Sequence, residues 1–433
     1  MNERETLKNI NGKLYIGGVS CADLAQKYGT PLYVMDEQHI KDMCTVFNNT
    51  LKSEYGDGMI TYASKAFSCK EIYRIINSIG IGADSVSAGE IYTARSVGFP
   101  MHKICFHGNN KTANELSLAI DCCVGLIVID SYLEADLLNS ICKEKNMIQK
   151  VLIRVNPGVE AHTHHFIQTA KIDSKFGFSM ENGDAEQIIE HVNELSNLKL
   201  EGLHCHIGSQ IFESKSFVLA IEKMTDFYKK LKEQKNIEFD ILNLGGGFGI
   251  WYAEGDVKKT SKEYAEYVKI ISKTLLDCVD KKGIKKPFLI LEPGRSIVGE
   301  AGITLYTAGA KKEIKDVKNY VAIDGGMFEN PRYALYQAKY TVVSANKLNE
   351  PKKFKYTIAG KCCESGDVIA EDCVLPKVET GDLLAVLSTG AYNYSMASNY
   401  NRNLIPPVVM VKNGESRYAV LPQTFDDLLR NDV

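Results

Sequence analysis

Eight short apolar runs alternate with helix-like segments between residues 59 and 296, and this alternation limits the fold more than any other feature. The runs are rich in Ile, Leu and Val, which is typical of strands that are buried on both faces. They read MITYASKAF, IGADSVSAG, KICFHG, LIVID, KVLIRVNP, LEGLHCHIG, ILNLGGG and FLILEPGRS. Eight strand–helix units in roughly 240 residues predict a (β/α)8 barrel, with a doubly wound sheet as the alternative.

The segments between the runs carry helix-start signals. A Ser or Thr that is followed three residues later by Glu can form a capping box, in which both side chains satisfy free backbone N–H groups. The pairs are Ser68 with Glu71, Ser87 with Glu90, Thr112 with Glu115, and Ser131 with Glu134. Gly80 is the expected left-handed end of the first of these helices.

After about residue 305 the pattern changes to alternating strands that are separated by turns such as KNGE. The N-terminal stretches GKLYIGG and TPLYVMDE have the same strand-like character. We therefore predict a (β/α)8 barrel over residues 38–304 and an all-β domain, a β-sandwich or β-barrel, formed by residues 1–37 and 305–433.

Charge and composition argue against several functions. The net charge is −3, so no global field favours nucleic acid or an anionic membrane. No apolar run is as long as a membrane-spanning helix, and the N-terminus lacks a signal-peptide core. The twelve cysteines include no CxxC pair and do not resemble a secreted disulfide framework, which indicates a reduced, cytoplasmic location.

Special residues stand at the carboxyl ends of nearly all the predicted strands, which is where a barrel places its chemistry. They are Lys65, Asp84, His107, Asn156, His206, Ser209, Gly245 to Gly247, and Glu292 to Arg295. Lys65 is the least expected of them, because the apolar stretch around it leaves little solvated surface. The ordinary explanation of a lone lysine is that its stem lies along the surface while its charge reaches water.

Three motifs at these strand ends allow both a structural and a functional interpretation. The glycines of LNLGGGFG can form a tight turn or bring bare N–H groups near an anion. His204 and His206 share a face, so they could be core histidines or a metal pair. His206 could equally lie against an aromatic ligand ring, and Ser209 could bind phosphate. Glu292 needs a partner if it is buried, either Arg295 or a protonated ring nitrogen of a ligand.

Three further motifs lie outside the strand ends. NPRYALY carries Arg332 and Tyr336, and CCESGD carries Cys363 and Glu364. Buried cysteine is usually inert packing, but Cys363 stands beside an acid in a polar loop. The stretch AHTHHF, with its three histidines between residues 162 and 165, is interpreted as a polar active-site loop, and a metal site is the less favoured alternative.

Nine motifs together resemble those of the meso-diaminopimelate decarboxylase family, which belongs to the alanine-racemase-like, fold type III pyridoxal-phosphate enzymes. They read YASKAF, GADSVSAGE, EAHTH, DSKFGF, HCHIGSQ, LNLGGGFG, EPGRSIVG, CESGD and GAY…SNYN, and they span nearly the whole chain. The resemblance implies a cofactor-binding barrel, a C-terminal β domain, and a homodimer with active sites shared across the interface. The departures are local: Tyr333 stands where the family commonly has Pro, and Asn393 and Tyr394 follow GAY.

The resemblance implies a role for each matching residue. Lys65 would be the Schiff-base lysine, since enclosure favours the neutral amine that attacks the cofactor aldehyde. Glu292 would keep the ring nitrogen protonated, and His206 would stack on the ring. The residues implied to bind pyridoxal 5′-phosphate are Lys65, Asp84, His206, Ser209, Gly245, Gly246, Gly247, Glu292, Gly294, Arg295 and Tyr392.

The resemblance also implies how substrate is held. The implied substrate-binding residues are Arg295, Arg332, Tyr336, Glu364 and Tyr392. Guanidinium groups suit substrate carboxylates, and Glu364 would face the distal ammonium. Cys363, the second catalytic residue beside Lys65, would return a proton to the carbanion. Cys363 and Glu364 would come from the partner subunit, and no metal is expected.

The implied reaction is decarboxylation of meso-2,6-diaminopimelate to L-lysine and carbon dioxide, the last step of lysine biosynthesis. The nearest alternative is a decarboxylase of ornithine, arginine or carboxynorspermidine. Arg295 disfavours this alternative, because the distal amine of such a substrate needs an acidic partner and not a guanidinium. A metal-dependent barrel hydrolase using His204 and His206 is an alternative from another class. A non-catalytic pyridoxal-phosphate carrier is a third, and the β domain with CESGD argues against it.

Overall fold

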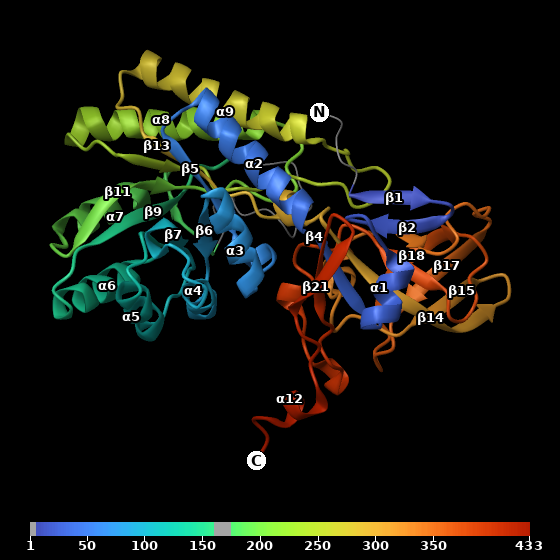
Figure 1. Cartoon of the computed structure of the whole chain (residues 1–433). Helices are drawn as coiled ribbons and strands as arrows, with labels where there is room; N and C mark the ends of the chain where they lie inside the picture. Colours follow the sequence, from blue (N-terminus) through green and yellow to red (C-terminus); the bar gives the residue numbers. More distant parts are fainter. Residues whose placement is uncertain (1–5, 160–174) are drawn as a thin grey trace. The chain divides into compact units, whose positions relative to one another are not determined.

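The computed structural model describes residues 6–159 and 175–433, and the chain divides into two compact units (Figure 1). The barrel unit comprises Met43–Gly249 and Lys259–Gly294. The β unit comprises Met1–Asp42, Ile250–Lys258 and Arg295–Val433. The domain boundaries proposed at residues 38 and 304 remain predictions, because compactness alone does not show which part of a chain folds by itself.

Eight parallel strands of the barrel unit close into a ring. In ring order they are β5 (Gly58–Ala63), β6 (Gly82–Ser85), β7 (Ile104–Phe106), β8 (Leu126–Ile129), β9 (Gln149–Asn156), β11 (Leu198–His204), β12 (Ile241–Asn243) and β13 (Phe288–Leu291). Parallel pairing of β13 with β5 completes the ring, and the short β10 (Phe178–Ser179) adds to β9 from outside it. The predicted (β/α)8 barrel is confirmed, and the doubly wound alternative is wrong because such a sheet would have open edges.

Helices follow the strands and lie outside them (Figure 1). They are α3 (Lys70–Ile79), α4 (Ala88–Arg95), α5 (Ala113–Asp121), α6 (Tyr132–Glu144), α7 (Asp184–Glu194), α8 (Lys215–Lys235) and α9 (Ser261–Lys282), while α2 (Glu37–Glu54) precedes β5. The hydroxyls of Ser87, Thr112 and Ser131 cap their helices as predicted, but the complete capping box is confirmed only for Thr112 with Glu115. Glu90 and Glu134 accept instead from the backbone N–H one residue before the cap. The Ser68 cap is wrong, because α3 begins two residues later with Cys69 at the cap position. Gly80 ends α3 in the left-handed conformation, as predicted.

Apolar side chains fill the barrel interior below the strand ends. Cys105, Leu126, Val128, Leu152 and Ile290 form one buried cluster from four different strands. Successive side chains of a strand point to opposite faces, so a residue two positions beyond Cys105 returns to the same side. The sequence of β7 therefore directs the residue that follows it, His107, toward the interior at the carboxyl end of the barrel.

The β unit contains one large mixed sheet and one small sheet. The large sheet runs in the order β18 (Val368–Leu375), β17 (Phe354–Ala359), β15 (Lys318–Ile323), β14 (Gly302–Ile314), β4 (Leu32–Asp36), β20 (Val408–Lys412) and β21 (Glu415–Val420), with β19 (Leu383–Val386) joining β14 to β16 (Val342–Ser344). The small sheet holds β1 (Leu7–Ile10), β2 (Lys13–Ile16) and β3 (Val19–Ser20). The N-terminal stretch TPLYVMDE thus supplies β4, which pairs with strands from far along the chain, β14 and β20. Short helices α1 (Cys21–Tyr28), α10 (Arg295–Val298), α11 (Arg332–Tyr336) and α12 (Phe425–Leu429) complete this unit.

The predicted KNGE turn joins β20 to β21. Lys412 pairs with Glu415 across the hairpin. Asn413 and Gly414 both have positive φ, 52° and 85°, as the tight two-residue hairpin turn requires. Among the described residues, a helix of the length and apolar character needed to cross a bilayer does not occur.

Candidate active site

A buried carboxylate, Glu292, occupies the carboxyl end of the barrel just after β13. His107 Nε2 donates to Glu292 Oε1 at 2.8 Å, and Asn243 Nδ2 donates to the same oxygen at 2.6 Å. His204 Nε2 lies 3.5 Å from the other oxygen, Oε2. The sequence left Arg295 as the alternative partner of Glu292. The described partners of Glu292 are instead His107 after β7, Asn243 in β12 and His204 in β11.

Charge is balanced within this group. Burial alone would raise the pKa of Glu292, but His107 and then His204 outweigh it, so the pKa of the carboxyl lies well below its usual value. Burial would lower the pKa of His107, but Glu292 reverses this and holds that pKa well above its usual value. The contact of His204 with Glu292 is longer, and burial lowers the pKa of His204 to about 3. The arrangement is therefore a buried imidazolium–carboxylate pair with a neutral histidine beside it.

The glycine run that follows β12 packs tightly beside Glu292. A Cβ on Gly246 would lie 2.1 Å from the backbone oxygen of Glu292, so no larger residue fits there without moving the backbone. Gly245 and Gly247 have φ of +65° and +104°, which side-chain-bearing residues rarely adopt. The Gly246 N–H donates to His206 Nδ1 at 3.3 Å, which connects the run to the segment after β11.

The remaining predicted residues of the barrel unit lie near the same end. Asp84 lies in β6, is buried, and has one carboxylate oxygen without a hydrogen-bond partner among the described residues. Burial raises the pKa of Asp84, against the opposing charges of His107 and Lys65. Ser209 is half-buried and Gly294 is buried against Ala63, with 2.8 Å between a Cβ at Gly294 and the Ala63 Cβ.

The enclosure predicted for Lys65 is wrong for this chain. Its neighbours Ser64 and Ala66 are buried, but Lys65 is exposed. The physical reason is that β5 ends at Ala63 and Lys65 lies in a single 3₁₀ turn, Ser64–Ala66, beyond the strand. The ammonium still lowers the pKa of His206, although burial contributes more, so Lys65 belongs electrostatically to the strand-end group.

A second group of predicted residues lies within the β unit. The Arg295 guanidinium donates to Tyr252 Oη at 2.5 Å and stacks on Tyr392, with 4.6 Å between Cζ and the ring centre. Arg332 is buried, donates to Tyr340 Oη at 2.7 Å, and lies 4.6 Å above the Tyr252 ring. Among the described residues, Arg332 has no carboxylate partner. A buried guanidinium whose described partners are tyrosine rings and a tyrosine hydroxyl is suited to a ligand carboxylate.

Three predicted residues are exposed on the β unit. Tyr336 lies in α11 with 47% of its surface exposed, and Cys363 and Glu364 lie exposed on the loop before β18. The Cys363 N–H donates to Asn401 Oδ1 at 2.9 Å, and buried Asp367 accepts hydrogen bonds from the backbone of Met327 and Cys362. The loop is thus held in shape while its cysteine and glutamate face outward.

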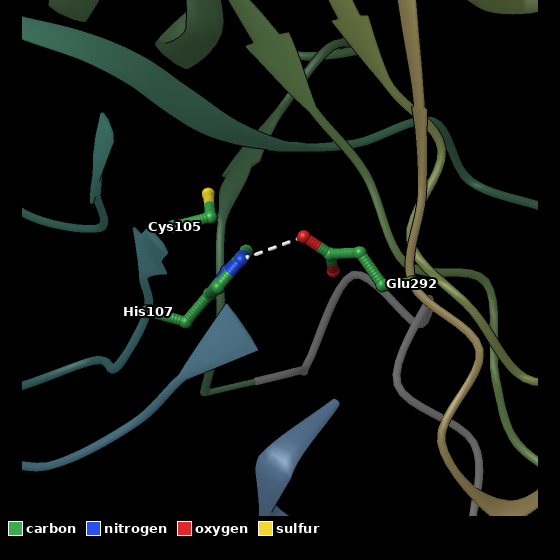
Figure 2. Close-up of side chains that lie close together, drawn as sticks. All are labelled: Cys105, His107 and Glu292. Atoms are coloured by element: carbon green, nitrogen blue, oxygen red, sulfur yellow. Dashed lines mark hydrogen bonds and ion pairs between the residues drawn. The ribbon is translucent and has the colours of Figure 1, made fainter. Parts of the chain in front are cut away.

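One cluster of the described residues could hold a metal ion. The donor atoms of Cys105, His107 and Glu292 lie within 4.8 Å of one another, and Figure 2 shows His107 and Glu292 directed at each other with Cys105 nearby. However, the 2.8 Å contact between His107 and Glu292 is a direct hydrogen bond, which a cation between them would replace. Among the described residues, no third ligand of this kind completes a site with the predicted His204–His206 pair. The predicted loop with His162, His164 and His165 lies outside the described residues.

Comparisons with known proteins decide the family. The family described as "Pyridoxal-dependent decarboxylase, pyridoxal binding domain" matches residues 38–299. A diaminopimelate decarboxylase of Bacillus subtilis is 48% identical over 98% of this chain and 96% of its own length, and one of Staphylococcus aureus is 46% identical over 98% and 99%. The chain belongs to the diaminopimelate decarboxylase family. A solved diaminopimelate decarboxylase of M. jannaschii in complex with L-lysine superposes with a TM-score of 0.91 at 37% identity, covering 99% of this chain and 98% of that one.

The strand-end group fits the cofactor of this family, pyridoxal 5′-phosphate. A phosphate needs backbone N–H groups that side chains do not obstruct, and the run from Gly245 to Gly247 has no side chains. A protonated ring nitrogen needs an ionised acceptor, and Glu292 is one. The cofactor aldehyde needs an accessible amine, and the exposed Lys65 offers it. The three functional groups of the cofactor thus each have a matching group in the barrel unit.

Sequence reasoning missed the partners of the predicted residues. It named His107 as unusual but gave it no role, and it did not single out Asn243, Tyr252 or Tyr340. Asn243 had a signal, since it stands just before the glycine run and its side chain accepts the Gly245 N–H at 2.9 Å. Tyr252 and Tyr340 had no sequence signal, because they are ordinary residues in segments without a motif.

Replacing Gly246 by alanine is expected to weaken cofactor binding. The new methyl group would meet the Glu292 backbone, and overpacking of this kind typically costs about 1–3 kcal/mol. We expect the affinity of the apoprotein for pyridoxal 5′-phosphate to fall about tenfold or more, measured by absorbance titration. Gly89→Ala is the matched control, because its Cβ would meet only Ser87 Oγ at 3.7 Å. Equal affinities in both variants would contradict the role of this run.

Proposed function

We propose that this protein decarboxylates meso-2,6-diaminopimelate to L-lysine and carbon dioxide, using pyridoxal 5′-phosphate. The observation that carries the proposal is the buried, ionised Glu292 beside a side-chain-free glycine run and an accessible Lys65. The diaminopimelate decarboxylases at 48% and 46% identity support the choice of substrate. The L-lysine bound in the M. jannaschii relative is the expected product.

The barrel residues prepare the cofactor. When bound, pyridoxal 5′-phosphate supplies an electron sink for the pair of electrons that carbon dioxide leaves behind. Lys65 would hold the aldehyde carbon, and Glu292 would keep the ring nitrogen protonated by accepting its N–H. His206 would pack on the ring, and Asp84 would contribute a buried acid to the same end. The phosphate would be held by Ser209, Gly245, Gly246, Gly247 and Gly294, with help from Tyr392, and Arg295 would also bind the cofactor.

Residues of the β unit hold and protonate the substrate. Arg295 and Arg332 bind its carboxylates, with Tyr336 and Tyr392 beside them, because a guanidinium fork matches a carboxylate. Glu364 binds the distal ammonium. Cys363 donates the proton that replaces the lost carboxylate.

We propose that the enzyme works as a homodimer whose active sites are shared. Cys363 and Glu364 are exposed on the single chain, which supports this proposal. Residues that act on an enclosed substrate have to be buried in the working enzyme, and a second subunit would bury them. We also propose a cytoplasmic location, which the twelve cysteines, all present as free thiols, support.

A substrate panel tests the reaction. We expect carbon dioxide release from meso-diaminopimelate with kcat/KM at least about 10²-fold higher than from ornithine, arginine or carboxynorspermidine. The reason is that these substrates lack the distal carboxylate, which leaves a guanidinium of Arg295 or Arg332 without its partner. Turnover of ornithine at the diaminopimelate rate would contradict the proposal and favour the alternative decarboxylases.

A metal analysis tests the alternative from another class. A barrel hydrolase would contain a stoichiometric divalent cation and lose activity to a chelator. We expect chelation to leave decarboxylation unchanged, and we expect the purified protein to show a visible absorption band from bound pyridoxal 5′-phosphate. A colourless protein that is active only with metal would overturn the assignment.

A further inference from the structure

The two oxygens of Glu292 have different surroundings. Oε1 accepts two short hydrogen bonds, from His107 at 2.8 Å and Asn243 at 2.6 Å. Among the described residues, the partner of Oε2 is His204 Nε2 at 3.5 Å, which is beyond the usual hydrogen-bond length. One oxygen of the carboxylate is therefore saturated by the protein, and the other retains its capacity to accept a strong hydrogen bond.

Three separate strands fix the carboxylate in this orientation. His107 follows β7, Asn243 is the last residue of β12, and His204 is the last residue of β11. The His107 and His204 rings meet edge to face with 4.7 Å between their centres, which limits rotation of either ring. Figure 2 shows His107 pointing directly at Glu292, with Cys105 alongside but without a bond to the carboxylate.

Among the histidines of this group, the positive charge resides on His107. Its raised pKa, which is caused by Glu292 against the effect of burial, keeps the ring protonated, whereas the pKa of His204, about 3, leaves that ring neutral. Asp84 and Cys105 also face His107, and both act to raise its pKa further. The largest contribution that keeps Glu292 ionised thus comes from His107, a residue to which the sequence gave no role.

We propose that His107 is a positioning residue for the reaction. Together with Asn243 it occupies Oε1 of Glu292, and it thereby leaves Oε2 as the acceptor for the protonated ring nitrogen of the cofactor. This inference rests on the proposed function, in which Glu292 binds that nitrogen. Its consequence is specific: His107 stabilises the cofactor only through the ring nitrogen, while the glycine run and Lys65 act on the phosphate and aldehyde.

Binding of two ligands distinguishes a positioning role of His107 from a role in packing alone. The first is pyridoxal 5′-phosphate, and the second is its 1-deaza analogue, in which a C–H group replaces the ring nitrogen. Apoprotein is titrated with each ligand, and the ratio of the two dissociation constants is the readout. A charge-assisted hydrogen bond predicts that the parent protein binds the natural cofactor at least about tenfold more tightly than the analogue.

The choice of variants is set by the contacts. His107→Phe keeps an aromatic ring against His204 but removes the donor and the charge, so we expect the ratio to fall to near one. His107→Gln keeps a donor without the charge and should give a ratio between those two values. Cys105→Ala removes a smaller contribution to the raised pKa of His107 and no contact with the carboxylate, so it is the control and is expected to keep a ratio well above one. Glu292→Gln removes the carboxylate itself and gives the ratio expected when the preference for the ring nitrogen is lost completely.

Each outcome decides the inference. An unchanged ratio in the folded Phe and Gln variants, whether or not both affinities drop together, would reduce His107 to packing and overturn the inference. If the Phe variant fails to fold, an unchanged ratio in the Gln variant alone overturns it. A parent ratio near one would overturn the assignment of Glu292 as well, and a protein that binds neither ligand would overturn the proposed function itself.

Discussion

Replacing Lys65 by alanine is expected to lower kcat by at least about 10³-fold, within the range seen when a positioned proton-transfer group is lost. The variant loses the amine that is proposed to bond to the cofactor aldehyde, and with it a charge that lowers the pKa values of His206 and Asp84. Its neighbours Ser64 and Ala66 carry no amine, so no other residue of this turn can take its place. Carbon dioxide release from meso-diaminopimelate measures the effect.

The control is Lys70→Ala, which removes another exposed lysine of the same connection, at the first position of α3. It is expected to keep normal turnover and the visible absorption band, while the Lys65 variant loses the band. A Lys65 variant with normal turnover would contradict the cofactor chemistry entirely, and one that loses turnover but keeps the band would show that the covalent bond forms elsewhere.

The barrel was predictable because its signals are local. Runs such as LIVI between Leu126 and Ile129 are short, apolar and β-branched, and pairs such as Thr112 with Glu115 mark the start of the helices between them. The error at Ser68 has a local cause too. The chain makes a 3₁₀ turn at Ser64–Ala66 before α3, and the helix cap falls at Cys69, one residue later than predicted.

The candidate site was predictable only in part. Position at a strand end identified Glu292, Asp84 and the glycines, because a barrel brings those ends together. The hydrogen bonds between them were not predictable, since His107 and Glu292 are 185 residues apart and meet only when the barrel has closed. Exposure of Lys65 also had no sequence signal, because an apolar neighbourhood in the chain does not show where a turn directs a side chain.

Mixing two inactive variants is expected to restore activity if the active sites are shared between subunits. Cys363→Ala alone should lose about 10²–10⁴-fold in kcat, because the proposed proton donor is gone. A heterodimer of the Lys65→Ala and Cys363→Ala chains has one site with both lesions and one with neither. Random re-association of two-fold symmetric dimers then gives about a quarter of the parent activity from two preparations that are each nearly inactive.

Recovered activity distinguishes a site that is formed by Lys65 and Cys363 of one chain from a site that is formed by Lys65 of one chain and Cys363 of the other. The exposure of the Cys363 loop is compatible with both arrangements. If Lys65 and Cys363 of the same chain formed each site, every site in the mixture would carry one lesion and no activity would return. Mixing Lys65→Ala with Gly246→Ala is the control, because both residues belong to the barrel unit of one chain. That pair places one lesion in each site of the heterodimer, so its activity should stay at the sum of the two separate preparations. Recovery in the cysteine mixture without recovery in the glycine mixture would establish that Cys363 acts on the cofactor of its partner.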